Sequence, residues 1–265
     1  MVCINRSLPR MTLAVAFTLG FVINVSAGVH AQLRPSSPSR IIPNTWEFQP
    51  PKRGTPGGRE GGATRGGCLE LTALVQKSGV GLTIAPYPTF LWSISLSKEE
   101  SSQKSRSQLE FVLEDESGEE VYKTTFAPKD NQGIVSLDLP AFANLPPLET
   151  GKEYHWIVTP ICNSSYLSQN AVQGWIKRVE PTPEFTRQLQ QATPTERLAL
   201  YANERLWYET VSSLAEMRRA QPNNPTLVDA WVRLLNLAGL NKIVQAPLIQ
   251  GSEAQTASGN STINN

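Results

Sequence analysis

Residues 90–96 read FLWSISL, and their side chains alternate with a period of two. Large apolar side chains stand at every second position from Phe90 to Leu96, while serines occupy positions 93 and 95. This is the period of a β-strand, because successive side chains of a strand point to opposite faces. The stretch therefore predicts a strand in the core of a sheet.

Six further stretches support an all-β fold. Clusters of Pro, Gly, Ser and Asp separate them, and the run Glu116-Ser117-Gly118-Glu119 predicts a hairpin turn. No long helical pattern interrupts the series, which disfavours a parallel sheet with crossover helices. We therefore predict a β-sandwich or barrel, with its other strands within residues 68–76, 109–113, 121–126, 133–139, 154–162 and 171–179.

A short motif favours one kind of sandwich. Residues 148–156, LETGKEYHW, resemble the L-x-x-G-x-x-Y stretch that begins the penultimate strand of immunoglobulin and fibronectin-III domains. In those domains the tyrosine hydroxyl hydrogen-bonds to the backbone a few residues upstream. The resemblance implies an immunoglobulin/fibronectin-III-like sandwich with Tyr154 at this corner. Burial of Tyr154 and Trp156 in a core is the alternative, and it also agrees with a sandwich.

The sequence becomes helical after residue 180. Thr182-Pro183 predicts the start of a short helix, and the run 193–196, TPTE, is a capping box with proline at the first helical position. We expect a small α-helical C-terminal segment with one helix pair that resembles a tetratricopeptide unit, plus a further helix. A single unit cannot stack, so its apolar stripes should dock onto the β domain or onto each other. These stripes comprise Trp207, Val211, Leu214 and Ala215, then Leu227, Trp231, Leu234 and Leu235.

The first residues predict export. Arg6 and Arg10 precede an uncharged apolar run at residues 11–25, which is shorter than the roughly 20 residues of a membrane span. Small residues follow, as in a cleavable signal peptide, and we expect cleavage after Ala31, with Ala27 as the other candidate. An uncleaved anchor is the alternative. Since no later segment is apolar enough, we expect no membrane span in the mature form, and a periplasmic or extracellular location.

Composition divides the chain into five parts. We predict a signal peptide at 1–31, a Pro/Ser-rich linker at 32–56, a Gly-rich arm with the β-sandwich domain at 57–180, the α-helical segment at 181–240 and a disordered tail at 241–265.

Charge and cysteine content narrow the classes of partner. The chain carries a formal net charge of +1, which becomes −1 when Arg6 and Arg10 leave with the signal peptide. A nearly neutral chain lacks the basic surface of a nucleic-acid-binding protein. Cys68 and Cys162 remain after loss of Cys3, and an even pair in an exported protein predicts one disulfide. Two buried free thiols are the alternative.

The mature chain offers few groups for catalysis. His155 is its one histidine, and we expect it on the strand face opposite Tyr154 and Trp156. One histidine and two paired cysteines are too few for a zinc site, so we predict no metal and no cofactor. The acidic run at 114–120 fits a solvated hairpin tip better than a calcium loop. The sequence therefore predicts a protein that is not an enzyme.

Two sets of residues are candidates for binding. The Gly-rich run 57–67 has no G-K-[ST] motif, which disfavours nucleotide binding. Three polar residues within this run either attach the arm to the sandwich by salt bridges or hold an anionic ligand or partner: Arg59, Thr64 and Arg65. The second set could stack on sugar rings, although burial is the alternative for each member: Trp46, Tyr87, Tyr166 and Trp175.

Several motifs together resemble a known family. They are GTPGGR at 54–59, GGATRG at 61–66 with Cys68, LTALV at 71–75, GLT at 81–83, PTF at 88–90, GIVS at 133–136, GWI at 174–176, and WYE at 207–209 with LAE at 214–216. The chain is similar over about residues 54–240 to the cyanobacterial exported family called domain of unknown function 928. The resemblance implies a cyanobacterial source, an envelope location and pairing of Cys68 with Cys162, and it implies no activity.

These observations favour a non-enzymatic module of the envelope or cell exterior that binds protein or acts structurally. A glycan-binding sandwich is the alternative, and a hydrolase that uses carboxylates is a weaker one. The expected partner is an envelope protein or a glycan.

Overall fold

The computed structural model describes residues 41–44, 60, 69–76, 79–96, 107–140, 145–162, 165–166 and 170–249. The chain divides into two compact units, Met1–Ser39 and Arg40–Asn265, and every described residue belongs to the second. The predicted signal peptide and most of the linker and Gly-rich arm lie outside the described residues. In the part that is described, no helix is long and apolar enough to cross a membrane.

The described strands form two sheets. The smaller sheet has the order β1-β3-β6 and is antiparallel throughout; its strands are β1 (Leu69–Ala73), β3 (Thr89–Leu96) and β6 (Gly133–Asp138). The larger sheet has the order β2-β9-β7-β4-β5, with β8 paired to the end of β7. Within it, β2 runs parallel to β9 and the other pairs are antiparallel. Its strands are β2 (Gly81–Thr83), β4 (Gln108–Glu114), β5 (Glu120–Phe126), β7 (Glu153–Cys162), β8 (Ser165–Tyr166) and β9 (Val172–Arg178).

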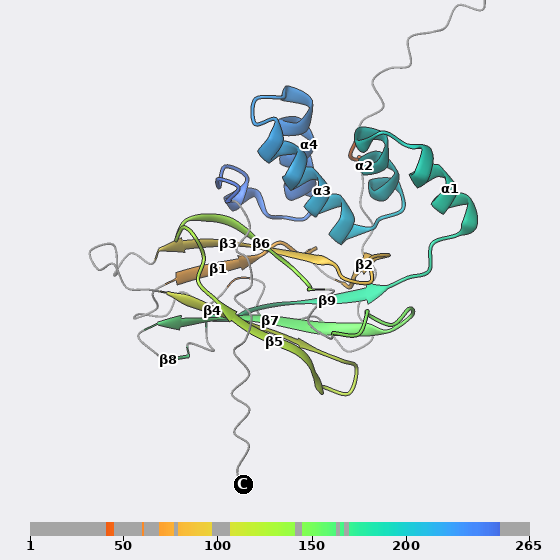
Figure 1. Cartoon of the computed structure of the whole chain (residues 1–265). Coiled ribbons are helices and arrows are strands. Elements are labelled where there is room, and N and C mark those ends of the chain that lie inside the picture. The colour runs from red at the N-terminus through yellow and green to blue at the C-terminus, as the bar shows by residue number, and fades with distance from the viewer. Residues whose placement is uncertain are drawn as a thin grey trace, which may run out of the picture. The chain divides into compact units, whose positions relative to one another are not determined.

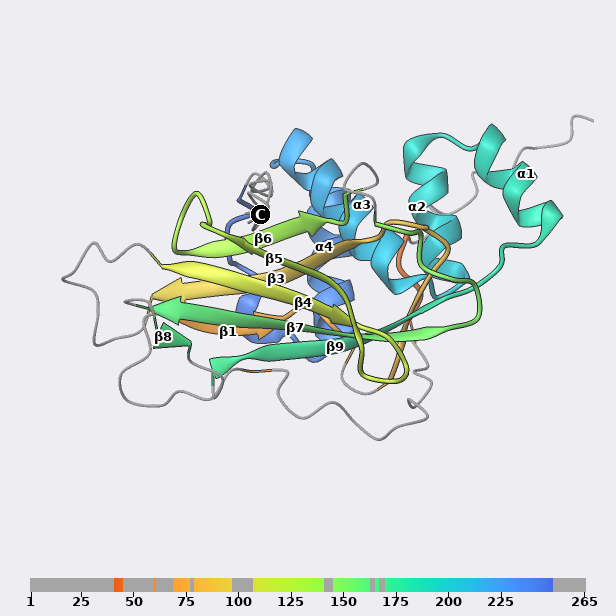
Figure 2. The same cartoon turned by 60° about the horizontal axis from the view of Figure 1, so that its bottom comes forward.

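The two sheets pack face to face (Figures 1 and 2), and aromatic side chains from both sheets contact each other between them. Phe90 of β3 lies 5.0 Å from Phe111 of β4 and 5.5 Å from Trp156 of β7, measured between ring centroids. Trp92 lies 5.8 Å from Phe126 of β5. Tilted and edge-on ring pairs at these separations are favourable beyond the area that they bury. This aromatic layer forms the centre of the core.

The predicted strand at 90–96 is confirmed, but it is buried on both faces. Phe90 and Trp92 point to the larger sheet, while Leu91 and Ser93 on the opposite face are only 2% and 6% exposed. Figure 1 shows the reason, because helices lie over the outer face of the β1-β3-β6 sheet.

The corner predicted at Tyr154 is present. The Tyr154 hydroxyl accepts a hydrogen bond of 2.8 Å from the backbone N–H of Glu149. Tyr154 is 4% exposed and begins the central strand β7, so the same residue fills the core and fixes the turn that precedes the strand.

Four helices follow the β-strands, and their caps match the predicted signals. Thr182 caps the first, and Thr193 with Glu196 forms the reciprocal capping box of the second. Each capping side chain satisfies a backbone N–H that has no partner inside the helix. The helices are α1 (Pro183–Gln191), α2 (Pro194–Asn203), α3 (Trp207–Ala220) and α4 (Pro225–Leu237).

The apolar stripes of α3 and α4 are buried, as expected for helices that dock. Helix α3 contacts α2, α4 and strands β2 and β3. The buried side chains of its stripe include Val211 and Leu214, and α4 buries Trp231 completely. The fold thus has three layers, which are the helices, the smaller sheet and the larger sheet (Figure 1).

The structure differs from the prediction at the start of the tail. Residues 241–249 form a 3₁₀ helix, η2 (Asn241–Ile243), and then a bridge to β6. Ile249 is 7% exposed, so this segment ends in a buried apolar side chain. The polar composition of residues 241–265 as a whole does not indicate this. Residues 250–265 lie outside the described residues.

Candidate binding site

The first turn of α3 carries three side chains that hold the helices onto the sheets. The Trp207 indole N–H donates to the carbonyl oxygen of Leu74, at 2.9 Å. The Tyr208 hydroxyl accepts from the indole N–H of Trp156, at 2.7 Å, and donates to the carbonyl oxygen of Trp175, at 3.1 Å. We call the run Trp207-Tyr208-Glu209 the docking triplet.

Glu209 completes the docking triplet with a buried carboxylate. Its Oε1 accepts hydrogen bonds from the Thr83 hydroxyl at 2.6 Å and from the backbone N–H groups of Ile84 and Ala85 at 2.8 and 3.0 Å. Its Oε2 is buried and has no hydrogen-bond partner among the described residues. Burial raises the pKa of Glu209, although these hydrogen bonds act in the opposite direction. A buried acid of this kind is often catalytic, but here it joins α3 to the segment that follows β2.

Close packing around Tyr208 explains a glycine in the edge strand β2. A Cβ added at Gly81 would lie 2.5 Å from Tyr208 Cε2, closer than any side chain tolerates. Burial also raises the pKa of the Tyr208 hydroxyl far above its usual range. This group therefore stays protonated and serves as a structural hydrogen-bond donor.

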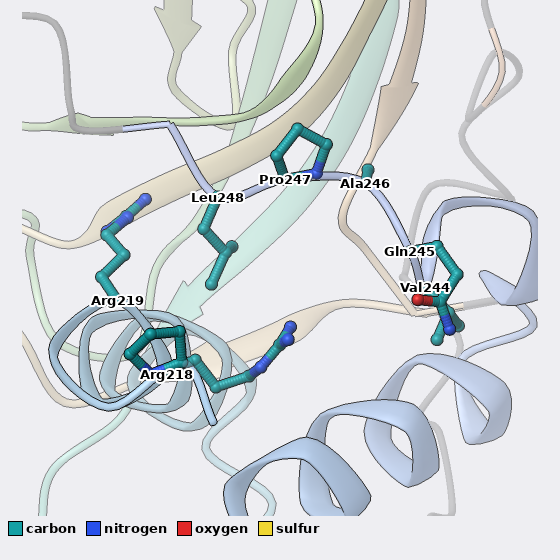
Figure 3. Close-up of a pocket in the computed structure, with 8 residues that line it drawn as sticks. Arg218, Arg219, Val244, Gln245, Ala246, Pro247 and Leu248 are labelled. Atoms are coloured by element: carbon teal, nitrogen blue, oxygen red, sulfur yellow. The ribbon is translucent and has the colours of Figure 1, made fainter. Parts of the chain in front are cut away.

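A pocket of about 610 Å³ opens at the other end of α3 (Figure 3). One wall is the last turn of the helix, and the other is the chain after η2. The lining comprises Arg218, Arg219 and Pro222, followed by residues 244–248, which are Val244, Gln245, Ala246, Pro247 and Leu248. We call it the arginine pocket.

The second wall is fixed to the edge of β6. The N–H of Ile134 donates to the carbonyl oxygen of Pro247 at 2.7 Å, and the N–H of Ile249 donates to the carbonyl oxygen of Ile134 at 2.9 Å. These bonds form a parallel bridge between Ile134 and Leu248. We call residues 244–249 the strap. Its last two residues continue the β1-β3-β6 sheet by one short step.

The two arginines are partly desolvated. Burial lowers the pKa of both, and for Arg219 the nearby carboxylates of Glu216 and Asp138 oppose this effect. The Nε atom of each is buried without a hydrogen-bond partner among the described residues. Leaving part of a guanidinium group unsatisfied costs free energy, and an anionic ligand could remove that cost.

The two arginine side chains reach different neighbours. The Arg219 side chain donates to the Ser136 hydroxyl of β6, at 3.3 Å. The Arg218 guanidinium lies 5.4 Å from the centre of the Trp231 ring on α4, a cation–π arrangement. Figure 3 shows the two side chains diverging from the helix, with the Leu248 side chain between them.

Neither arginine forms an ion pair with a carboxylate that the structure describes. Two positive charges at the rim of a partly apolar pocket therefore remain available for a ligand. The pocket residues include no carboxylate, imidazole, thiol or hydroxyl side chain among those that the structure describes.

Of the predicted binding residues, Trp175 is placed away from the arginine pocket. It lies on the outer face of the larger sheet and stacks on His155, with 4.7 Å between ring centroids. The His155 Nδ1 lies 3.2 Å from Glu114 Oε2, and its Nε2 lies 2.8 Å from Gln173 Oε1. As predicted, His155 is on the opposite face from the buried Tyr154 and Trp156.

Most other predicted binding residues lie outside the described residues, namely Trp46, Arg59, Thr64 and Arg65. The same holds for Cys68 and for the side chain of Tyr166. The Tyr87 hydroxyl donates to the carbonyl oxygen of Leu145, which is a structural contact. Cys162 is 5% exposed, and its disulfide with Cys68 stays a prediction.

No pattern in the sequence predicts the arginine pocket. Arg218 and Arg219 lie within the predicted helical segment at 181–240, and the strap lies within the predicted tail at 241–265. The residues of the strap form no recognisable motif. The strap contacts β6, which lies more than 100 positions earlier, and no local sequence pattern predicts a contact over such a separation. A search for clusters of three or more possible metal ligands finds none within the described ranges.

Comparisons with known proteins give a family and little else. A family model described as Domain of Unknown Function (DUF928) matches residues 56–248. A search of curated proteins gives no match. The chain is 13% identical to the sensor domain of the anti-sigma factor RsgI4 of Pseudobacteroides cellulosolvens, with a TM-score of 0.28 over 44% of this chain and 99% of that one. It is 13% identical to a protein named as a beta-galactosidase from Bacteroides fragilis, with a TM-score of 0.21 over 42% of this chain and 16% of that one. Neither structural likeness is close enough to support an argument.

Proposed function

We propose a non-enzymatic protein-binding role, in the periplasm or outside the cell, for this chain. The chain belongs to the family described as Domain of Unknown Function (DUF928). The observation that carries the proposal is the arginine pocket. It offers two guanidinium groups without ion-pair partners among the described residues, and its described lining lacks the paired acid and base that catalysis would use.

The positions of the other ionisable groups support a binding role. Burial raises the pKa of both Glu209 and Tyr208, and both side chains hold α3 to the sheets. His155 contacts Glu114 and Gln173 and stacks on Trp175. None of its hydrogen bonds to the described residues reaches a serine, threonine or cysteine that could act as a nucleophile. These groups act in folding, which leaves the arginine pocket for recognition.

The proposal includes export from a cyanobacterial cell. It depends on cleavage of the first 31 residues and on a disulfide between Cys68 and Cys162. Support for the bridge comes from the positions of its neighbours: Leu69 begins β1, and the buried Cys162 ends β7. A bridge there would join one edge of the smaller sheet to the centre of the larger one.

The proposal also includes an immunoglobulin/fibronectin-III-like sandwich. The smaller sheet pairs strands in the order β1-β3-β6, and the larger one in the order β9-β7-β4-β5. Antiparallel sheets with these crossed connections, together with the hydrogen-bonded Tyr154 before β7, support such a topology. The parallel β2–β9 pair adds an edge to the larger sheet.

Glycan binding is the second candidate, and Trp175 favours it. Its indole ring stacks on His155, whose ring nitrogens contact the polar groups of Gln173 and Glu114. No described helix covers this outer face of the larger sheet (Figure 2). Sugar recognition commonly combines an aromatic ring with such polar groups. One ring face is already in contact with His155, which leaves the other for a ligand.

Site-specific photo-crosslinking tests the protein-binding role. A photoreactive residue at Gln245, an exposed position of the strap, should trap a protein in intact envelopes. The adduct should disappear when Arg218→Gln and Arg219→Gln are combined. The same probe at Asn236, an exposed position on α4 in a different surface hollow, is the control. Absence of any Gln245-specific protein adduct would contradict the proposal.

A further inference from the structure

We infer that the arginine pocket binds an extended acidic peptide segment of the partner protein, with carboxylates at Arg218 and Arg219 and backbone pairing at Leu248. This inference rests on the proposed function and names the chemistry of its ligand. It follows from three features of the pocket, which are two separate cationic positions, a free strand edge and an apolar lining without aromatic rings.

The cationic positions suit a chain with several charges. Arg219 reaches towards Ser136 on β6, and Arg218 lies over Trp231 on α4. Figure 3 shows that the two guanidinium groups do not converge on one point, so a single small anion would meet only one of them. A peptide with two carboxylates could meet both, and guanidinium groups bind carboxylates through two parallel hydrogen bonds.

The strap offers an edge for an extended peptide. In its parallel bridge, Ile134 bonds to the residues on either side of Leu248. The N–H and C=O of Leu248 therefore point away from β6. No described residue hydrogen-bonds to either group. A peptide that adds as a further strand can satisfy them, which is a common mode of peptide recognition.

The rest of the lining favours a peptide over a glycan. Between and beside the arginines lie small or aliphatic groups, including Ala246, Pro247 and Leu248. The Trp231 ring is 0% exposed and lies beneath Arg218, so the described lining has no aromatic face on which a sugar could stack. The backbone and aliphatic side chains of a peptide match this surface better.

Two nearby carboxylates set the charge balance. Glu216 and Asp138 act on Arg219 through space, but neither is within ion-pair distance of it. Asp138 accepts a hydrogen bond from the Thr89 hydroxyl at 2.5 Å, which directs it to β3. We therefore expect the peptide to gain more from Arg218, and the affinity to fall with added salt.

Fluorescence anisotropy with a labelled synthetic peptide tests the inference. The probe is Ac-Ala-Glu-Leu-Glu-Ala-Glu-Leu-Glu-NH₂, and its counterparts carry glutamine for glutamate, or N-methyl groups on the leucines. The glutamate peptide should bind at least about tenfold more tightly than the glutamine peptide, a difference near 1.4 kcal/mol. The N-methylated peptide should also bind several-fold more weakly, because it cannot pair as a strand.

Variants of the protein locate the binding. Arg218→Gln with Arg219→Gln should weaken binding of the glutamate peptide at least about tenfold, and the two lysine substitutions should weaken it less. Arg197→Gln with Arg233→Gln removes the same charge from α2 and α4 and should change the affinity less than twofold. Arg197 donates to Ala192 and Arg233 to Asn44, so neither contacts the pocket. Should the glutamine pair fail to fold, the lysine pair supplies the test.

Three outcomes would overturn the inference: no binding of the glutamate peptide, equal binding by the arginine-pocket variant, or tighter binding of polygalacturonate at the same site. Each is separable from failure of the proposed function. Crosslinks from Gln245 with no peptide affinity would leave a protein-binding pocket whose ligand is not acidic. Peptide affinity without crosslinks would leave the chemistry of the pocket but remove the protein partner in the envelope.

Discussion

Glu209 shows how one side chain can link distant parts of this chain. A single oxygen accepts three hydrogen bonds from residues that lie more than 120 positions earlier. The Ala85 N–H also donates to the Thr83 hydroxyl oxygen at 3.0 Å, whereas the Thr83 hydroxyl and the Ile84 N–H would lose the acceptor that Glu209 gives them. A buried donor left without a partner costs about 1–3 kcal/mol. The charge of the carboxylate opposes folding, because burial removes it from water. The same desolvation raises the pKa of Glu209. Glu209 therefore stabilises through its oxygen and not through its charge.

The pH dependence of stability should reveal this balance. Because the folded-state pKa of Glu209 is raised, its contribution to stability is full below the ordinary value of 4.5 and is lost as pH rises through the folded-state pKa. Glu209→Gln cannot ionise and keeps an oxygen for the three donors. The free energy of unfolding of this variant, relative to wild type, should therefore increase as pH rises above 4.5. Urea denaturation across that pH range measures it.

Glu184→Gln is the matched control for that comparison. Its side chain is 62% exposed and pairs with Arg187 on the same turn of α1. Surface pairs of this kind contribute less than about 1 kcal/mol, so this variant should follow the pH profile of wild type closely. A Glu209→Gln profile parallel to that of wild type would show that Glu209 has the same pKa in the folded and unfolded states.

At the scale of elements, the strap protects an exposed sheet edge. Strand β6 lies at the edge of the smaller sheet, and unpaired edge strands invite pairing with other chains. Residues 247–249 cover part of that edge through two backbone hydrogen bonds. Gly133 allows the close approach, since it has a φ of 138° and a Cβ there would lie 2.6 Å from the Pro247 carbonyl oxygen.

Gly133→Ala should therefore detach the strap. We expect the amides of Ile134 and Ile249 to exchange their hydrogens at least about tenfold faster, as measured by hydrogen exchange, because their bonds to the strap and to β6 weaken. Gly118→Ala is the control, since Gly118 has a φ of 89° but nothing within 4 Å of an added Cβ. It imposes backbone strain of about 1–3 kcal/mol without a clash. Equal protection in both variants would argue against an anchored strap.

The elements also show which parts of the structure a sequence can predict. The caps at Thr182 and Thr193 depend on residues within one turn, and the bond of Tyr154 spans five positions, so each left a local pattern. Strands β2 and β8, of three and two residues, are too short to show a period. The arginine pocket needed α3, α4, β6 and the strap to meet, and no local preference encodes such a meeting.

For the whole molecule, the predicted disulfide offers a measurable contribution to stability. A bridge between Cys68 and Cys162 would close a long loop, which the chain-entropy model values at roughly 4–5 kcal/mol. Replacing both cysteines with serine should lower the free energy of unfolding by about that amount in urea denaturation. Cys3→Ser should have no effect on the exported protein, because Cys3 belongs to the predicted signal peptide. Mass spectrometry that finds two free thiols in the exported protein would contradict the bridge.

The docking triplet has a practical meaning for anyone who divides this protein into pieces. Trp207, Tyr208 and Glu209 share hydrogen bonds with both sheets and with the segment after β2. A fragment that stops near residue 180 would lose the partner of the Trp156 indole and uncover the aromatic interior around it. Loss of activity in such a fragment would reflect its disrupted core and not the role of the deleted residues. Single side-chain substitutions are therefore the better way to assign roles along this chain.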